Sequence, residues 1–294
     1  METSLLQAFI QVADLGSFSA AAQSLELTQP AVSKRISALE EQLATKLFDR
    51  IGKQIGLTEA GELLLPRAKR IIQEVRDTRT LVQNLTDTVS GRLVLGTSHH
   101  VGLHRLPPVL RKFCGRYPDV AMDIAFMESE AAYAAVLQGE LEVAVITLAQ
   151  DDMPRVFSHG IWDDPLSFVV SNDHTLAGRR TVQLKELQEY PAILPDEHTF
   201  TRRIVNEQFR RRRCALQVSM TTNYLETIKM MVSIGLAWSV LPETMLERKL
   251  CRMNVQQISI SRRLGYIYHR ERTLSNAAMA FVRLLEQYGS GTGD

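Results

Sequence analysis

From Gly91 to the C-terminus, short apolar segments alternate with longer segments in which apolar residues recur every three to four positions. The short segments are typical of buried β-strands, and the longer ones have the period of amphipathic helices. Strands are predicted over 92–96, 121–126, 143–147, 166–171, 192–194, 216–221 and 237–240, and helices over 103–116, 131–137, 184–187, 201–212, 225–234 and 276–287. Such alternation indicates a parallel sheet covered by helices, here arranged as two α/β lobes.

Residues 5–48 carry a different pattern, that of three short helices. A first apolar stripe stops at Gly16, a residue type that commonly ends helices, and Ser17 is placed to cap a second short helix. Thr28 is placed to cap a third, with Pro30 in the first turn, where a missing N–H costs nothing. A helix, a tight turn and a capped helix with a polar outer face are typical of a helix-turn-helix.

Two further segments complete this N-terminal region. Gly52 and Gly56 bracket a short polar loop between two extended pieces, as in the wing of a winged helix. From Glu59 to Leu85 the apolar residues alternate at intervals of four and three, which is a heptad seam that requires a partner helix. The seam residues are Leu64, Ala68, Ile71, Val75, Thr78, Val82 and Leu85.

The composition limits the possible classes of protein. The chain has 294 residues, enough for about two domains. Three cysteines without a CxxC pair exclude a disulfide framework and the common zinc-module spacings, and they fit a reducing cytoplasm. No apolar run approaches the roughly 18 residues that span a bilayer. We therefore expect a cytoplasmic protein with no membrane partner.

Bulk charge argues against nucleic-acid binding. The 34 Lys and Arg against 33 Asp and Glu give a net charge of +1, and residues 1–65 hold five basic and eight acidic residues, which is 5 − 8 = −3. The positions of the basic residues nevertheless favour DNA binding, because they converge on the third helix and the wing. These residues are Lys34, Arg35, Arg50 and Lys53. This balance predicts weak non-specific DNA affinity and reliance on binding at two sites.

Many motifs occur in a fixed order along the chain. They are FSAAAQSLELTQPAVSKRISALEEQLATKLFDR (18–50), LTEAG (57–61), RLVLGT (92–97), RYPDVAMDI (116–124), LQGELEVAVI (137–146), PAILPDEHTFTRRIV (191–205) and IKMMVSIGLAWSVLP (228–242). Through these motifs the chain resembles the LysR-type transcriptional regulators over essentially its whole length. The resemblance implies a winged helix-turn-helix over 1–58, a linker and dimerisation helix over 59–90, and a periplasmic-binding-protein-like effector domain over 91–294, with lobe I at about 91–161 and 269–294 and lobe II at about 162–268.

The resemblance also implies a function. The protein is expected to bind double-stranded promoter DNA, to form a homodimer through the linker helix and then a homotetramer, and to contact RNA polymerase. A small-molecule co-inducer, bound between the lobes, is expected to control it, with no other cofactor.

DNA-contacting residues follow by position within this resemblance. Gln29 has the chemistry to bond adenine in bidentate fashion, Lys34 to neutralise phosphate or reach guanine, and Lys53 to enter the minor groove from the wing tip. The alternative is that such residues are ordinary caps and a solvated rim. The predicted DNA-binding residues are Thr28, Gln29, Pro30, Ser33, Lys34, Arg35, Arg50, Lys53 and Thr58.

Effector-binding residues are predicted where helices begin after strands, since helix N-termini supply unpaired N–H groups. These donors, two imidazoles and a guanidinium favour a small anion with a carboxylate. The competing interpretation makes Ser98 and Asn223 helix caps only. His100 stands where the family more often has a small hydroxyl residue. The predicted effector-binding residues are Ser98, His99, His100, Thr147, Thr199, Phe200, Thr201, Arg202 and Asn223.

Other functions were weighed against this one. His100 and His104 are four residues apart, but no nearby Cys, Asp or Glu completes a metal site. The arginine run 210–213 is better explained as a solvated helix end than as a nucleic-acid patch. The chain lacks GxSxG, a Walker lysine loop, HExxH and a GxGxxG after a strand, which argues against an enzyme. An effector-independent regulator and a small-molecule receptor without a DNA role stay open.

Overall fold

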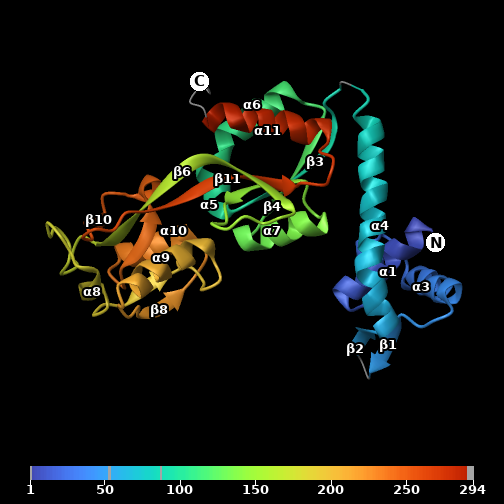
Figure 1. Cartoon of the computed structure of the whole chain (residues 1–294), viewed down its shortest axis with the longest axis horizontal. Coiled ribbons are helices and arrows are strands. Elements are labelled where there is room, and N and C mark those ends of the chain that lie inside the picture. Colours follow the sequence, from blue (N-terminus) through green and yellow to red (C-terminus); the bar gives the residue numbers. More distant parts are fainter. Residues whose placement is uncertain (1, 52–53, 87, 290–294) are drawn as a thin grey trace. The chain divides into compact units, whose positions relative to one another are not determined.

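The computed structural model describes residues 2–51, 54–86 and 88–289. It divides into two compact units, Met1–Thr86 and Asp87–Asp294, whose elements are labelled in Figure 1. Within the described residues, no helix combines the length and the apolar composition needed to cross a bilayer.

The first unit is a bundle of helices with a hairpin. The Gly16 backbone takes the left-handed conformation (φ 60°) that ends the first helix, and the Ser17 and Thr28 side chains accept hydrogen bonds from the Ala20 and Ala31 N–H groups. The predicted winged helix-turn-helix is thus confirmed. Its elements are α1 (Thr3–Leu15), α2 (Phe18–Ser24), α3 (Gln29–Leu43), β1 (Phe48–Ile51), β2 (Gln54–Leu57), paired antiparallel, and α4 (Glu59–Gln83).

Helix α4 presents two different apolar faces. Ala68 and Ile72 are buried in the core that α1 and α3 form, and Leu64 packs against the same core. By contrast, Ile71 is 38% exposed and Val82 is 62% exposed. The predicted seam is therefore wrong for Leu64 and Ala68, which serve the unit's own core, because α4 must also close the bundle from which it emerges.

The second unit is built on one seven-stranded sheet. Its order is β10-β6-β11-β5-β3-β4, with β9 paired to β6. Only the β3–β4 and β3–β5 pairs are parallel, and the other pairs are antiparallel, so the predicted parallel sheet is mixed. The strands are β3 (Gly91–Thr97), β4 (Val120–Phe126), β5 (Val143–Thr147), β6 (Val156–Ser171), β9 (Ser239–Pro242), β10 (Leu250–Met253) and β11 (Ile260–His269).

Helices cover this sheet, and the buried apolar residues form a main core in each lobe with further clusters beside it. A separate parallel pair, β7 with β8, lies in the second lobe. An isolated β-bridge between Ala192 and Trp238 connects this pair to the segment just before β9. The remaining elements are α5 (His99–His104), α6 (Leu106–Arg116), α7 (Ser129–Gln138), α8 (Leu184–Leu187), β7 (Ala192–Leu194), α9 (Phe200–Arg211), β8 (Val218–Thr221), α10 (Leu225–Ser233), the 3-10 turn η1 (Glu243–Met245) and α11 (Asn276–Gly289).

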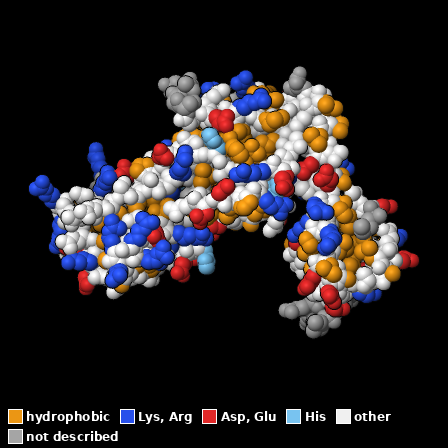
Figure 2. All heavy atoms as spheres, in the orientation of Figure 1, with side chains coloured by type: hydrophobic (Ala, Val, Ile, Leu, Met, Phe, Trp, Pro, Cys, Tyr) orange, Lys and Arg blue, Asp and Glu red, His pale blue; other side chains and the backbone are white. Residues whose placement is uncertain are grey.

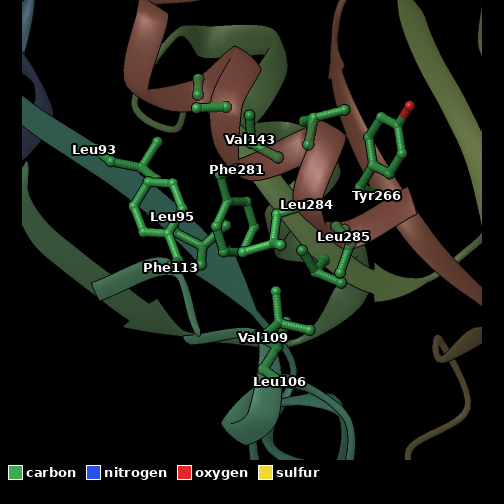
Figure 3. Packing of buried hydrophobic residues seen from close by; sticks show 14 of the residues in the cluster. Leu93, Leu95, Leu106, Val109, Phe113, Val143, Tyr266, Phe281, Leu284 and Leu285 are labelled. Carbon is green, nitrogen blue, oxygen red and sulfur yellow. The ribbon is translucent and has the colours of Figure 1, made fainter. Parts of the chain in front are cut away.

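The first lobe has its main core where α6 and α11 meet the sheet. Phe113 and Phe281 lie edge to face there, with ring centroids 5.3 Å apart, and Leu93 and Leu95 of β3 pack beside them (Figure 3). In the second lobe the fully buried Trp238 stacks on Phe209, 5.7 Å between centroids. Burial of such aromatic residues contributes much of the packing energy of a core.

Strands β6 and β11 belong to both lobes. Phe157 and Trp162 of β6 pack against the first core, whereas Phe168 and Val170 of the same strand lie in the second. Figure 1 shows these two strands running from one lobe to the other. Residues where the lobes meet are therefore carried on continuous strands, which fixes their positions.

Candidate functional site

The outer face of α3 carries the residues predicted to read DNA. Gln29, Pro30 and Lys34 are exposed, while Ser33 and Arg35 are half-buried. Gln29 Nε2 donates a hydrogen bond to Ser33 Oγ at 3.2 Å, which holds the amide over the first turn. Val32, Ile36 and Leu39 occupy the opposite face and are buried in the core. Burial of one face therefore fixes which side chains point outward.

The other predicted DNA contacts differ. Thr28 caps α3 and is exposed beside Gln29. The Thr58 hydroxyl donates to the Lys46 carbonyl at 2.7 Å and accepts from the Gly61 N–H at 3.1 Å. Its single hydrogen is thus used inside the unit, so the predicted phosphate contact of Thr58 is replaced by a structural role. Arg50 is placed in β1 by its backbone only, and Lys53 lies outside the described residues.

A buried carboxylate that the sequence did not reveal fixes the end of α3. Glu40 accepts hydrogen bonds from the Leu47 N–H at 2.9 Å and from Lys46 Nζ at 2.7 Å. Burial raises the pKa of Glu40, but these two donors outweigh burial and leave the pKa below its usual value. Glu40 therefore ties the C-terminal part of α3 to the chain that enters the hairpin.

A cavity of about 260 Å³ lies between the two lobes of the second unit. Eight of the nine residues predicted to bind an effector line it, brought together from four separate turns of chain. The lining residues are Ser98, His99, His100, Phe126, Met127, Glu128, Ser129, Glu130, Thr147, Pro195, Thr199, Phe200, Thr201, Asn223, Tyr224, Leu225 and Arg262. We call this cavity the cleft.

Arg202 is the predicted residue that does not line the cleft. Its Nε donates to Asn206 Oδ1 at 2.7 Å and its Nη1 donates to the Pro195 carbonyl at 3.1 Å. Burial lowers the pKa of this guanidinium. The Arg202 side chain therefore binds α9 and the loop before this helix and does not reach the cleft. The arginine that lines the cleft is Arg262.

Three residues of the cleft resemble helix caps in the sequence, namely Ser98, Thr199 and Asn223. Thr199 does cap α9, accepting a hydrogen bond from the Arg202 N–H at 3.2 Å. Asn223 Oδ1 instead accepts from the Asp196 N–H at 2.8 Å. Within the described residues, the Ser98 side chain makes no capping bond to α5. Ser98 and Asn223 therefore do not serve as caps, and both face the cleft.

Arg262 belongs to a buried cluster centred on Asp164. The two residues are direct cross-strand partners on β11 and β6, and Arg262 Nε donates to Asp164 Oδ2 at 2.8 Å. Arg262 Nη1 donates to Thr201 Oγ1 at 2.8 Å. His100 Nε2 lies 3.7 Å and Arg105 Nη2 3.5 Å from the Asp164 carboxylate. We call Asp164, Arg262, Arg105 and His100 the Asp164 cluster.

The charges of this cluster are set by their environment. Burial alone raises the pKa of Asp164, but the facing His100 imidazole and Arg262 guanidinium outweigh it and lower the pKa to about 2. Burial lowers the pKa of His100, which favours the neutral form of the imidazole. Two guanidinium groups thus face one carboxylate, and the cluster carries one positive charge in excess.

Two glutamates from the start of α7 reach across the cleft. Glu130 Oε1 accepts a hydrogen bond from the Phe200 N–H, the first of α9, and Glu128 Oε1 accepts one from Asn223 Nδ2. Burial raises the pKa of Glu130. The sequence offered no signal for either residue, because they lie in an ordinary helix-starting segment.

An aromatic wall lies beside these carboxylates. The His99 ring is 5.3 Å from that of Phe126 and 4.8 Å from that of Tyr224, centroid to centroid.

His104 lies on the same helix as His99, and its Nε2 is 2.9 Å from Glu226 Oε1 of α10. Over the described residues, no three His, Cys, Asp or Glu side chains come together to hold a metal ion.

The arginine run 210–213 lies at the end of α9. Arg211 Nε donates to Glu207 Oε1 at 2.6 Å, and Arg210 pairs with the same carboxylate. Basic side chains gather over the part of the second unit formed by α8, β8 and α9 (Figure 2). The pairing along one helix supports the interpretation of this run as a solvated helix end.

Known protein families account for both units. The family described as "Bacterial regulatory helix-turn-helix protein, lysR family" matches residues 3–62, and the one described as "LysR substrate binding domain" matches residues 86–290. A probable RuBisCO transcriptional regulator from Synechocystis sp. is 30% identical to this chain over an alignment of 294 positions. The alignment covers 95% of this chain and 84% of that protein.

Solved structures share the fold. CbnR complexed with its target DNA superposes with a TM-score of 0.65 at 20% identity, over 98% of this chain and 100% of that one. The effector binding domain of QuiR in complex with shikimate gives 0.63 at 16% identity, over 69% of this chain and 98% of that one. With both family matches and a full-length relative, the chain belongs to the LysR family of DNA-binding transcriptional regulators with an effector-binding domain.

Proposed function

We propose that this protein binds a dyad-symmetric promoter site through α3 and the hairpin of two protomers, under the control of a small carboxylate-bearing molecule in the cleft. The observation that carries the proposal is the outer face of α3, where Gln29, Ser33 and Lys34 stand on a fully packed inner face. Binding at promoters places the protein in the cytoplasm, where RNA polymerase is the expected further partner. The structure of CbnR with its target DNA supports the DNA role.

Self-association follows from α4. Ile71 and Val82 leave apolar surface in water along α4, as does Leu85 just after the helix, and a second copy of α4 would cover it. We propose a homodimer through this seam and a homotetramer of two such dimers.

The small-molecule role rests on the cleft. Its walls come from both lobes, so a ligand that prefers one lobe arrangement shifts the population toward it. The buried Arg262 guanidinium and the start of α9 offer donors for a carboxylate. QuiR in complex with shikimate, itself a carboxylate, supports this assignment.

Titration of operator DNA at several salt concentrations tests the DNA role. The Lys34→Ala variant should bind more weakly and with a log–log salt slope smaller by about 0.9, because one phosphate contact is lost. Lys249→Ala removes the same charge from an exposed position of the second unit and should behave as the wild type. Equal affinity and slope in both variants would reject α3 as the DNA-reading element.

A receptor without a DNA role predicts no operator affinity in any variant. An effector-independent regulator predicts normal operator affinity together with no thermal stabilisation by any organic acid. The two alternatives are thus separated by the same pair of measurements.

A further inference from the structure

Arg262 has an unused donor at the floor of the cleft. Its side chain is only 5% exposed, and two of its nitrogens are engaged with Asp164 and Thr201. Among the described residues, none accepts a hydrogen bond from Arg262 Nη2. A buried N–H without an acceptor is unfavourable, so an acceptor supplied by a ligand would be bound favourably.

The opposite side of the cleft is acidic. Glu128 and Glu130 both line it, and each accepts one hydrogen bond from the second lobe, which leaves further lone pairs on both carboxylates. Of the residues that line the cleft, Arg262 is basic and Glu128 and Glu130 are acidic, so carboxylates outnumber guanidinium groups there. A dianion would therefore meet repulsion, whereas a ligand with both a carboxylate and a cationic group would find a partner for each.

We propose that the effector is an α-amino acid or a close zwitterionic analogue, whose carboxylate binds Arg262 Nη2 and whose ammonium binds Glu128 and Glu130. This inference rests on the proposed control by a ligand in the cleft and names the second polar group of that ligand. The wall formed by His99, Phe126 and Tyr224 is the surface for the side chain of the amino acid.

The pKa of Glu130 supports the same assignment. Burial raises this pKa and outweighs the hydrogen bond from the Phe200 N–H and the nearby Arg203 guanidinium. An ammonium group next to it would stabilise the ionised carboxylate.

The test begins with the full chain and the twenty protein L-amino acids, each added singly in a thermal-shift experiment. The amino acid that stabilises most is then compared by calorimetry with its deaminated acid and its decarboxylated amine. We expect the amino acid to bind about tenfold or more tightly than either, since each analogue lacks the partner of one charged side chain of the cleft. Equal affinity of the deaminated acid, or no stabilisation by any amino acid, overturns the proposal.

Substitutions identify the two polar groups separately. Glu130→Gln should lower the affinity for the amino acid toward that of the deaminated acid, and should leave the affinity for that acid unchanged or higher. Glu140→Gln, at the far end of α7, removes an exposed carboxylate and should change neither. Arg262→Gln should weaken the amino acid and the deaminated acid alike, with folding checked by circular dichroism. An unchanged preference in Glu130→Gln overturns the ammonium assignment.

Failure of this inference is distinguishable from failure of the proposed function. A protein that binds operator DNA and takes only the deaminated acid keeps both DNA reading and a carboxylate effector, and it loses the ammonium subsite alone.

Discussion

At the scale of single residues, Asp164 determines the character of the cleft floor. It has no exposed surface, it faces two arginines, and it directs Arg262 toward Thr201 and the cleft. Removing one partner of a buried ion pair is far more costly than the pair itself is stabilising, because the other charge is left without compensation.

Asp164→Asn should therefore destabilise the second unit by about 3–5 kcal/mol. The amide keeps the shape of the carboxylate but leaves Arg262 and Arg105 without a counter-charge. Urea unfolding followed by circular dichroism measures the change. The matched control is Asp163→Asn, because the neighbouring Asp163 side chain is 86% exposed and its loss should change stability little. Equal stability of the two variants would contradict this account.

The same residue predicts part of the acid sensitivity. The folded-state pKa of Asp164 lies at about 2, below the ordinary 3.8, so the unfolded state takes up a proton first as the pH falls. The stabilisation from Asp164 is complete above pH 3.8 and is lost as the pH falls toward 2. Unfolding free energies measured across that interval should fall less steeply in Asp164→Asn than in the wild type.

At the scale of elements, a strand or helix is predicted well from the sequence when its residues follow one hydrophobic pattern along the whole segment. Strand Val143–Thr147 is entirely buried and apolar, and its predicted limits are confirmed. The predicted helix over 103–116 is in fact two, because the chain breaks at Arg105, before two prolines, and α5 begins earlier at His99. Prolines in a first turn favour a new helix start, a signal that the apolar period does not contain.

Strands β10 and β11, and the first ten residues of β6, were not predicted. Strand β11 contains Arg262 and Arg263, and the register with β6 shifts between Leu264 and Gly265. A strand that serves two cores changes its buried face along its length and so loses strict alternation. Arg262 was missed as a site residue for the same reason, since its relation to Asp164 depends on a pairing between positions 98 residues apart.

Helix α4 allows a test of self-association at this scale. Val82→Asp places a charge in the seam at a position that is 62% exposed in the single chain, so the unit should stay folded while the dimer dissociates. Light scattering after gel filtration measures the mass, and operator affinity should fall because the two half-sites are no longer bound together. Arg76→Ser, another exposed position of α4, should leave the mass at that of the wild type.

At the scale of the whole molecule, the net charge does not describe the charge of the DNA-binding region. The sum of +1 hides a DNA-binding region of −3 over residues 1–65, so attraction to DNA depends on a few residues at α3 and the hairpin. Such a region gains affinity from paired binding more than from general attraction to phosphate. The helices and hairpin of the first unit follow from patterns that are local in sequence, whereas the cleft assembles residues from several segments that are far apart in the chain.

The two strands shared by the lobes also constrain how such a protein diversifies. Recombination can exchange the second unit as a whole between relatives, because a single chain crossing joins it to the first. Exchange of one lobe alone would divide β6 and β11, the strands that carry residues of both hydrophobic cores. We therefore expect ligand preference to change through substitutions around the cleft, where Glu130 and His100 lie.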